Sequence, residues 1–170
     1  MIRKPEKSEY NPFYEPYVGR LDSDDMLAVL REQLITIPAF FGALTEEQGV
    51  YRYGEGKWSI KEVLNHINDI ERIFSYRAMC ISRGEHQSLP GMDQDIYQKH
   101  SGTDRRSLAS LVTEFKAIRT ATLCLFEHLN EADSLKVGEA SGSKVTVRAL
   151  AAHIAGHAAH HQQVTEERYL

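Results

Sequence analysis

The sequence contains little cysteine, no long apolar run and no block of charge of one sign. Cys80 and Cys124 are the only cysteines among 170 residues, so neither a disulfide framework nor a Cys-x-x-Cys metal site is available, and we expect both to be buried free thiols. No segment approaches the roughly 18 apolar residues of a membrane span, and the first residues lack the apolar core of a signal peptide. We therefore expect a cytoplasmic protein with no membrane partner.

The balance of charge excludes another class of partner. Lysine and arginine total 20 against 24 aspartate and glutamate, which gives a formal net charge of −4, and the two signs are mixed along the chain. Proteins whose main task is to bind nucleic acid usually carry a basic face. The sequence therefore predicts no nucleic-acid partner.

The length of the chain is that of one compact domain, which we assign to residues 1–170. A chain of this size buries roughly 70% of the surface of its unfolded form, so it can fold without disulfides or a structural metal. Any metal site would then serve function rather than folding. Residues 1–22 are rich in tyrosine and proline, and we expect an extended arm whose aromatic side chains pack onto the rest of the domain.

Hydrophobic spacing predicts the fold class. Four segments place apolar residues at alternating steps of three and four, which is the pattern of a helix with one buried face. The apolar positions run from Leu27 to Phe41, from Ile60 to Phe74, from Leu108 to Leu129 and from Val147 to Val164. This pattern predicts an all-α protein built as a four-helix bundle.

Residues with capping side chains mark the expected helix starts. Ser23 is the expected N-cap of the first helix, and Ser59 with Glu62 forms the capping box of the second. The third helix should begin after residues 101–103, and the fourth after its cap Thr146.

Two connections differ from simple turns. Residues 84–102 contain a Pro-Gly pair and are longer than antiparallel neighbours need, so we expect a crossover between the second and third helices. Residues 134–145 can form a small hairpin that turns at Ser141 and Gly142, before the last helix. The bundle is therefore not expected to have simple up-down-up-down connectivity.

Histidine is the unusual feature of the composition, because four of the eight fall within residues 153–161. His157 and His161 occupy positions at which the apolar stripe of the last helix requires hydrophobic side chains. Their spacing of four puts them on one face with Cβ atoms about 5–6 Å apart, from which both imidazoles can reach one metal ion. His66, at the edge of the apolar face of the second helix, is the candidate third ligand. Three imidazoles leave coordination positions open for water or substrate, as in catalytic metal sites.

Each of these histidines also has a structural interpretation. A single buried imidazole is more often a hydrogen-bonded core residue than a metal ligand, and this applies above all to His66. Two adjacent imidazoles without partners would cost free energy in a core, which favours metal binding by His157 and His161. His153 and His160 project to the sides of the stripe, and His160 is the better placed of the two to support the site.

Asp69 lies about one helical turn after His66 and is the candidate for a catalytic or positioning role. Three alternatives stay open at this point. It accepts a hydrogen bond from His66, it acts as a general base, or it forms a salt bridge on the helix surface with Arg72 or Lys61.

Three segments of the chain resemble a known family. The segments GKWSIKEVLNH (residues 56–66), LPGMDQD (residues 89–95) and AGHAAHH (residues 155–161) are similar to the DinB-like superfamily, in its YfiT-like branch of metal-dependent hydrolases and thiol transferases. The resemblance runs over nearly the whole chain. It implies a four-helix bundle with up-down-down-up connectivity, in which the long crossover joins the second and third helices.

The resemblance also implies a set of metal ligands and a range of activities. One histidine of the second helix and two of the last, spaced by four, bind the ion in this family, and here these positions hold His66, His157 and His161. His153 is an additional histidine outside the family pattern. Relatives include enzymes that conjugate the thiols bacillithiol or mycothiol and a mycothiol-dependent isomerase, and homodimers are common among them.

We therefore predict a metal-dependent enzyme that acts on a small-molecule substrate and uses a divalent ion, zinc or nickel. An open position that binds water gives a hydrolase of amides or esters, whereas one that binds a low-molecular-weight thiol gives a thiol S-transferase. The sequence does not choose between them. The alternative from another class is a bundle that binds a metal or small ligand without turnover.

Overall fold

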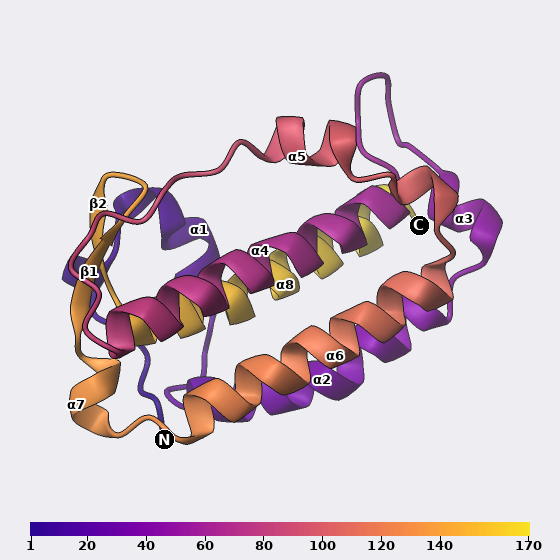
Figure 1. Cartoon of the computed structure of the whole chain (residues 1–170). Helices are drawn as coiled ribbons and strands as arrows, with labels where there is room; N and C mark the ends of the chain where they lie inside the picture. The colour runs from indigo at the N-terminus through magenta and orange to yellow at the C-terminus, as the bar shows by residue number, and fades with distance from the viewer.

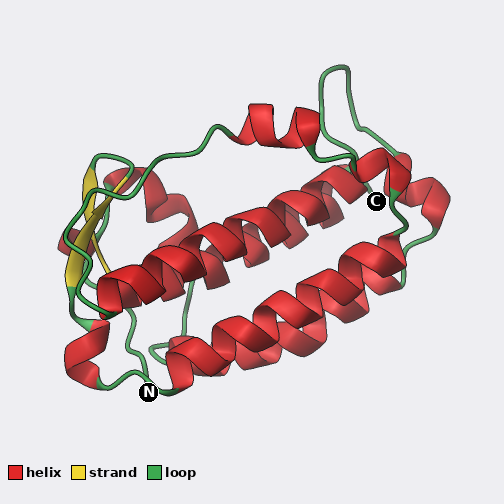
Figure 2. Ribbon diagram, in the orientation of Figure 1, coloured by secondary structure: helices red, strands yellow, loops and turns green.

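The computed structural model describes residues 1–170, and four long helices form most of it (Figure 1). They are α2 (Met26–Gly42), α4 (Ile60–Ser82), α6 (Leu108–Glu127) and α8 (Val147–Arg168). The shorter elements are η1 (Lys7–Glu9), η2 (Pro12–Tyr14), α1 (Glu15–Val18), α3 (Glu46–Val50), α5 (Gln94–His100), η3 (Thr103–Arg105), α7 (Glu131–Ser134), β1 (Val137–Ala140) and β2 (Ser143–Thr146). Strand is confined to one hairpin (Figure 2), and the predicted all-α four-helix bundle is confirmed.

The long helices have up-down-down-up connectivity. In Figure 1, α2 and α8 run in one direction, whereas α4 and α6 run in the other. Because α4 and α6 are parallel, the chain between them must return along the bundle, and a helix of about 20 residues is about 30 Å long. Residues 83–107, which include α5, make this return, as expected for the crossover.

Side-chain caps set the starts of the helices. The Ser59 backbone N–H donates to Glu62 Oε2 (2.6 Å), and the Glu62 N–H donates to Ser59 Oγ (3.3 Å), which completes the predicted capping box of α4. Thr146 caps α8 as predicted, since its Oγ1 accepts from the Ala149 N–H at 3.1 Å.

Two predicted helix starts were wrong. Asp25 caps α2, because its carboxylate accepts from two amides of the first turn, while the Ser23 hydroxyl instead accepts from the Asp25 N–H at 3.1 Å. A carboxylate at this position also interacts favourably with the helix dipole. The third helix begins after Ser107, whose hydroxyl accepts from the Ser110 N–H.

The predicted hairpin is present before the last helix. Strands β1 and β2 pair in antiparallel register, with Ala140 opposite Ser143. Ser141 and Gly142 at the turn both have positive φ angles, 53° and 72°, as a two-residue type I′ turn requires.

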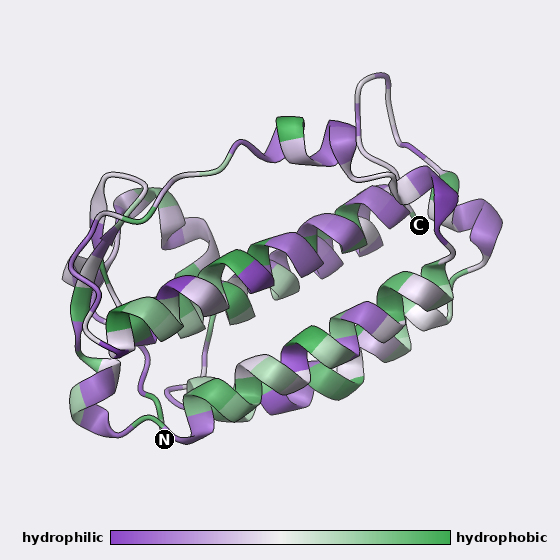
Figure 3. Ribbon diagram, viewed as in Figure 1, coloured by the Kyte–Doolittle hydropathy of each residue, from purple (hydrophilic) through white to green (hydrophobic).

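Two groups of buried apolar side chains fill the bundle. The larger group joins the arm and the hairpin to one end of the four long helices, and the smaller one lies toward the other end of the same helices. Figure 3 shows hydrophobic and hydrophilic residues interleaved along these helices. Between the two groups lies a buried ion pair, in which Arg119 donates to both carboxylate oxygens of Glu71 (2.7 and 2.9 Å).

The arm, residues 1–22, packs through α1 onto α8. Gly156 of α8 allows this approach, because a Cβ atom built there would lie 2.2 Å from the Tyr17 carbonyl oxygen. Tyr10 is buried as expected, but Phe13 is 73% exposed. The expectation that the arm buries its aromatic side chains is therefore correct only in part.

The two cysteines differ in how far they are buried. Cys80 is partly buried, but Cys124 is exposed on α6, so its predicted burial was wrong. No helix combines the length and the apolar character that crossing a membrane requires.

Candidate metal centre

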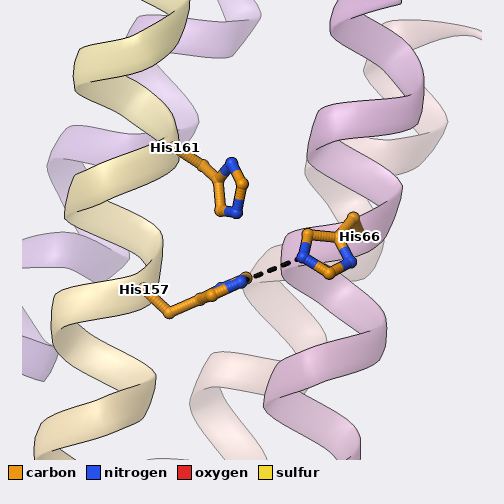
Figure 4. Close-up of side chains that lie close together, drawn as sticks. All are labelled: His66, His157 and His161. Atoms are coloured by element: carbon orange, nitrogen blue, oxygen red, sulfur yellow. Dashed lines mark hydrogen bonds between the residues drawn. The ribbon is translucent and has the colours of Figure 1, made fainter. Parts of the chain in front are cut away.

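Three histidines meet where α4 and α8 pack against each other (Figure 4). His66 comes from α4, whereas His157 and His161 lie one turn apart on α8. One ring nitrogen from each lies within 4.8 Å of the other two, and His157 Nε2 is 3.0 Å from His66 Nε2. His66 and His157 are buried and His161 is half-buried. The structure thus brings together the three histidines predicted as ligands, here called the histidine trio, while their metal binding stays a prediction.

Burial determines the protonation state of the histidine trio. It lowers the pKa of His66 to about 4. The pKa values of His157 and His161 are also lowered well below 6.5, by burial first and then by the neighbouring imidazoles. All three rings are therefore neutral at pH 7, the state in which imidazole binds a metal ion.

The donor set fits a divalent transition-metal ion. Imidazole nitrogen suits zinc and nickel, whereas calcium and magnesium prefer oxygen ligands. Nitrogen atoms bound to one zinc ion at about 2.1 Å lie at most about 4.2 Å apart, so small rotations of the rings suffice to bring the most distant pair into reach. The 3.0 Å approach of two Nε2 atoms also shows that both rings direct this nitrogen toward a common point.

Two aromatic rings pack against the histidine trio. The ring centroid of Trp58 is 4.8 Å from that of His66. The ring of Tyr17, from the arm, is 5.4 Å from His157 and 5.2 Å from His160. The contribution of Tyr17 was not predicted from the sequence, because only folding brings the arm to this point.

The two flanking histidines lie outside the trio. His153 stacks on Phe74 with centroids 4.0 Å apart, and its Nδ1 is buried without a hydrogen-bond partner. Burial, with the nearby charge of Arg77, lowers the pKa of His153 to about 3. His160 is only half-buried and lies beside the trio, with its ring centroid 5.0 Å from that of His161.

Asp69 does not contact the histidine trio. Its carboxylate accepts a hydrogen bond from Asn65 Nδ2 at 2.9 Å and lies 3.7 Å from Arg72 Nη1. The alternative of a helix-surface salt bridge with Arg72 therefore matches the geometry, and the suggested hydrogen bond from His66 does not. Lys61 pairs with Glu46 instead.

Two cavities adjoin the trio. The larger, of about 620 Å³, reaches His66 and His157 at one end and Arg77 at the other, with walls from the arm, α4, the crossover, the hairpin turn and α8. The smaller, of about 270 Å³, reaches His161 and Trp58. A small molecule can thus approach the imidazoles through either cavity, without passing between α2 and α6.

The profile of the DinB superfamily matches residues 30–164. The chain belongs to the DinB superfamily. No curated protein matches the sequence of this DinB chain. Its fold is similar to that of YfiT from Bacillus subtilis, described as a probable metal-dependent hydrolase with an unusual four-helix bundle topology. The two chains share 15% sequence identity, the TM-score is 0.71, and the match covers 93% of each chain.

Proposed function

We propose that this DinB protein is a metal-dependent enzyme that binds a divalent ion, zinc or nickel, through His66, His157 and His161. The observation that carries the proposal is the convergence of three neutral imidazoles, two buried and one half-buried, beside two cavities. A divalent ion held there would act as a Lewis acid that lowers the pKa of water or of a thiol. The substrate is a small molecule, and the reaction is a hydrolysis or the transfer of a low-molecular-weight thiol.

The protein contributes position and environment to this chemistry. The spacing of four on α8 presents His157 and His161 from a rigid helix, and α4 holds His66 opposite them. The rings of Trp58 and Tyr17 pack against His66 and His157. Charges act more strongly in such a site than in water, because the local dielectric constant is low.

One observation favours the alternative of a binding protein without turnover. No acidic side chain forms a hydrogen bond or an ion pair with any histidine of the trio. A hydrolase of this arrangement would need substrate, solvent or a histidine such as His160 to accept the proton. The similarity to YfiT supports the enzyme, and the lack of a carboxylate bonded to the trio supports the binder, although Asp95 lines the smaller cavity together with His161.

An experiment separates these functions. Purified protein is analysed for bound metal and then assayed with a model ester and, separately, with a thiol and a generic electrophile. We expect about one divalent ion per chain and activity in one assay, which chelation removes and zinc or nickel restores. Metal binding without activity in either assay would favour the binder, and no metal in native or reconstituted protein would contradict both.

The matched variants are His157→Ala and His128→Ala. His128 is exposed on the surface, so its loss should change neither metal content nor activity. The cytoplasmic location and the homodimer are also proposals, which cell fractionation and sedimentation would test.

A further inference from the structure

Arg77 is a buried cation without an acidic partner. The residue is 2% exposed, and no carboxylate lies within 4.0 Å of its guanidinium group. Its Nη2 donates to the Pro90 carbonyl oxygen at 2.7 Å and to Ser141 Oγ at 2.9 Å. The group also lies over the Phe74 ring, with the guanidinium carbon 5.0 Å from the centroid. The side chain of Tyr14, which also lines the larger cavity, interacts with the guanidinium group as well, but it carries no permanent negative charge.

In the other deeply buried arginine of the chain, every nitrogen of the guanidinium group has a hydrogen-bond partner. Arg119 uses Nε and Nη2 on Glu71, and Nη1 on the Leu30 carbonyl oxygen and Gln33 Oε1. A buried charge without a counter-charge costs free energy. Arg77 differs from Arg119 in one further respect, which is that it lines the larger cavity.

That cavity is electrostatically one-sided. No aspartate or glutamate lines it, and Arg77 is the only residue with a permanent charge in its wall. The hydroxyl groups of Ser141 and Ser143 lie at the same end. The cavity therefore favours an anionic group near Arg77 and disfavours a cationic ligand.

The distance between Arg77 and the trio defines the shape of the ligand. His66, Ile70, Phe74 and Arg77 follow one another at helical spacing along a single face of α4 and line the same cavity. The Cα atoms of His66 and Arg77 are about 16 Å apart along the helix axis. The wall between them is mixed: Ile70, Phe74 and Met92 form its apolar part, and His153 and Gln94 add polar groups.

We propose that Arg77 binds the carboxylate of an elongated small-molecule substrate whose apolar or extended body runs along α4 and whose reacting end lies at the histidine trio. This inference rests on the proposed function for the reacting end, but the carboxylate contact depends on Arg77 alone. Guanidinium is well suited to it, because its planar array of N–H donors matches the two oxygens of a carboxylate.

The test compares two ligands of equal length, octanoate and its neutral analogue octanamide. Their affinities for metal-free full-length protein, kept in chelator, are measured by ligand-detected NMR titration. Removal of metal prevents the carboxylate from binding an ion, so the result does not depend on whether the proposed metal site is correct. We expect octanoate to bind at least tenfold more tightly than octanamide.

Variants then assign this preference to one side chain. Arg77→Met should abolish the preference for octanoate, and Arg77→Lys should keep part of it, since lysine retains the charge without the planar donors. Arg83→Met is the charge-matched control, because Arg83 is exposed and does not line this cavity. It should leave the preference unchanged.

Other outcomes would overturn the proposal. Equal binding of the two ligands by the wild-type protein contradicts it even if Arg77→Met fails to fold. The proposal is also wrong if the preference for octanoate survives in folded Arg77→Met, or if it falls equally in Arg83→Met. Arg77 would then have only a structural role, through its hydrogen bonds to Pro90 and Ser141. Failure of the proposed function, with octanoate preference retained, would leave an anion-binding cavity without the metal chemistry.

Discussion

The ion-pair cluster of Arg119, Glu71 and Gln33 and the histidine trio are both buried and polar, and α4 contributes to each. In the ion-pair cluster every side-chain nitrogen of Arg119 has a partner, and Gln33 also donates to the Ala155 carbonyl oxygen of α8 at 2.8 Å. In the trio two imidazoles face each other through Nε2 beside a cavity. A buried polar cluster whose groups all bond to one another stabilises the fold, whereas a cluster beside a cavity has polar atoms that a ligand can reach.

Removal of one member of the ion pair should have the largest effect on stability. Glu71→Ala leaves Arg119 as an uncompensated buried charge, which should lower the free energy of unfolding by about 3–5 kcal/mol. Urea denaturation of metal-free protein measures this loss. The control is His66→Ala in the same metal-free protein, which should cost far less. Equal losses would mean that the trio is as structural as the ion pair.

Metal affinity is the property that the trio should control. His157→Ala or His161→Ala should lower the affinity for zinc or nickel at least 100-fold, about 2.7 kcal/mol, because each removes one of three ligands. Competition with a chromogenic chelator provides the measurement. His153→Ala should have a much smaller effect, and an equal loss there would show that the wrong face of α8 was assigned.

Removal of the metal should leave the helices in place. The bundle has its own apolar core, unlike small zinc modules that unfold without their ion. Far-UV circular dichroism should therefore change little on chelation, while Tm falls by the amount that ligand binding to the native state adds. A collapse of the helical signal would make the ion structural.

The buried, neutral imidazole of His66 should make stability depend on pH. The folded-state pKa of His66 is about 4, lowered by burial from 6.5, so between these values the unfolded chain binds a proton that the native state does not. Stability should therefore fall as pH decreases, by about 2 kcal/mol between pH 7 and pH 5 for this residue. Metal-free His66→Ala should show a shallower slope in denaturation experiments, and an unchanged slope would contradict burial of a neutral imidazole.

The smallest expected effect concerns the cover of the site. In Gly156→Ala the new Cβ would lie 2.2 Å from the Tyr17 carbonyl oxygen, so the arm must move away from α8, at a cost of roughly 1–2 kcal/mol. Gly42→Ala is the matched control, because no atom lies within 4 Å of its added Cβ, and alanine should stabilise that helix position by about 0.5–1 kcal/mol. Thermal denaturation compares the two, and a neutral Gly156→Ala would show that the arm is loosely held.

The parts of the fold that the sequence predicted depend on local interactions. Each of these local structures involves residues within three positions of one another, so a short segment of sequence determines its geometry. They are the Ser59 capping box, the Thr146 cap and the turn at Ser141 and Gly142. The prediction failed where two local partners compete, as Ser23 and Asp25 do for the start of α2. It failed also for Cys124, because the apolar stripe of α6 does not say which side chains beside it another helix covers.

Hydrophobic periodicity was enough to predict the four helices, and loop length was enough to predict the crossover. The pairing of His157 with His161 follows from their spacing, because residues four apart lie on one face of a helix. The proximity of His66 to that pair was a hypothesis from its position on the second helix. The packing of the whole chain was needed to show that Tyr17 packs against the trio and that Arg77 lines the same cavity without a counter-charge. These facts depend on contacts between segments distant in the chain, and such contacts follow from the packing of the whole core rather than from any short pattern of residues.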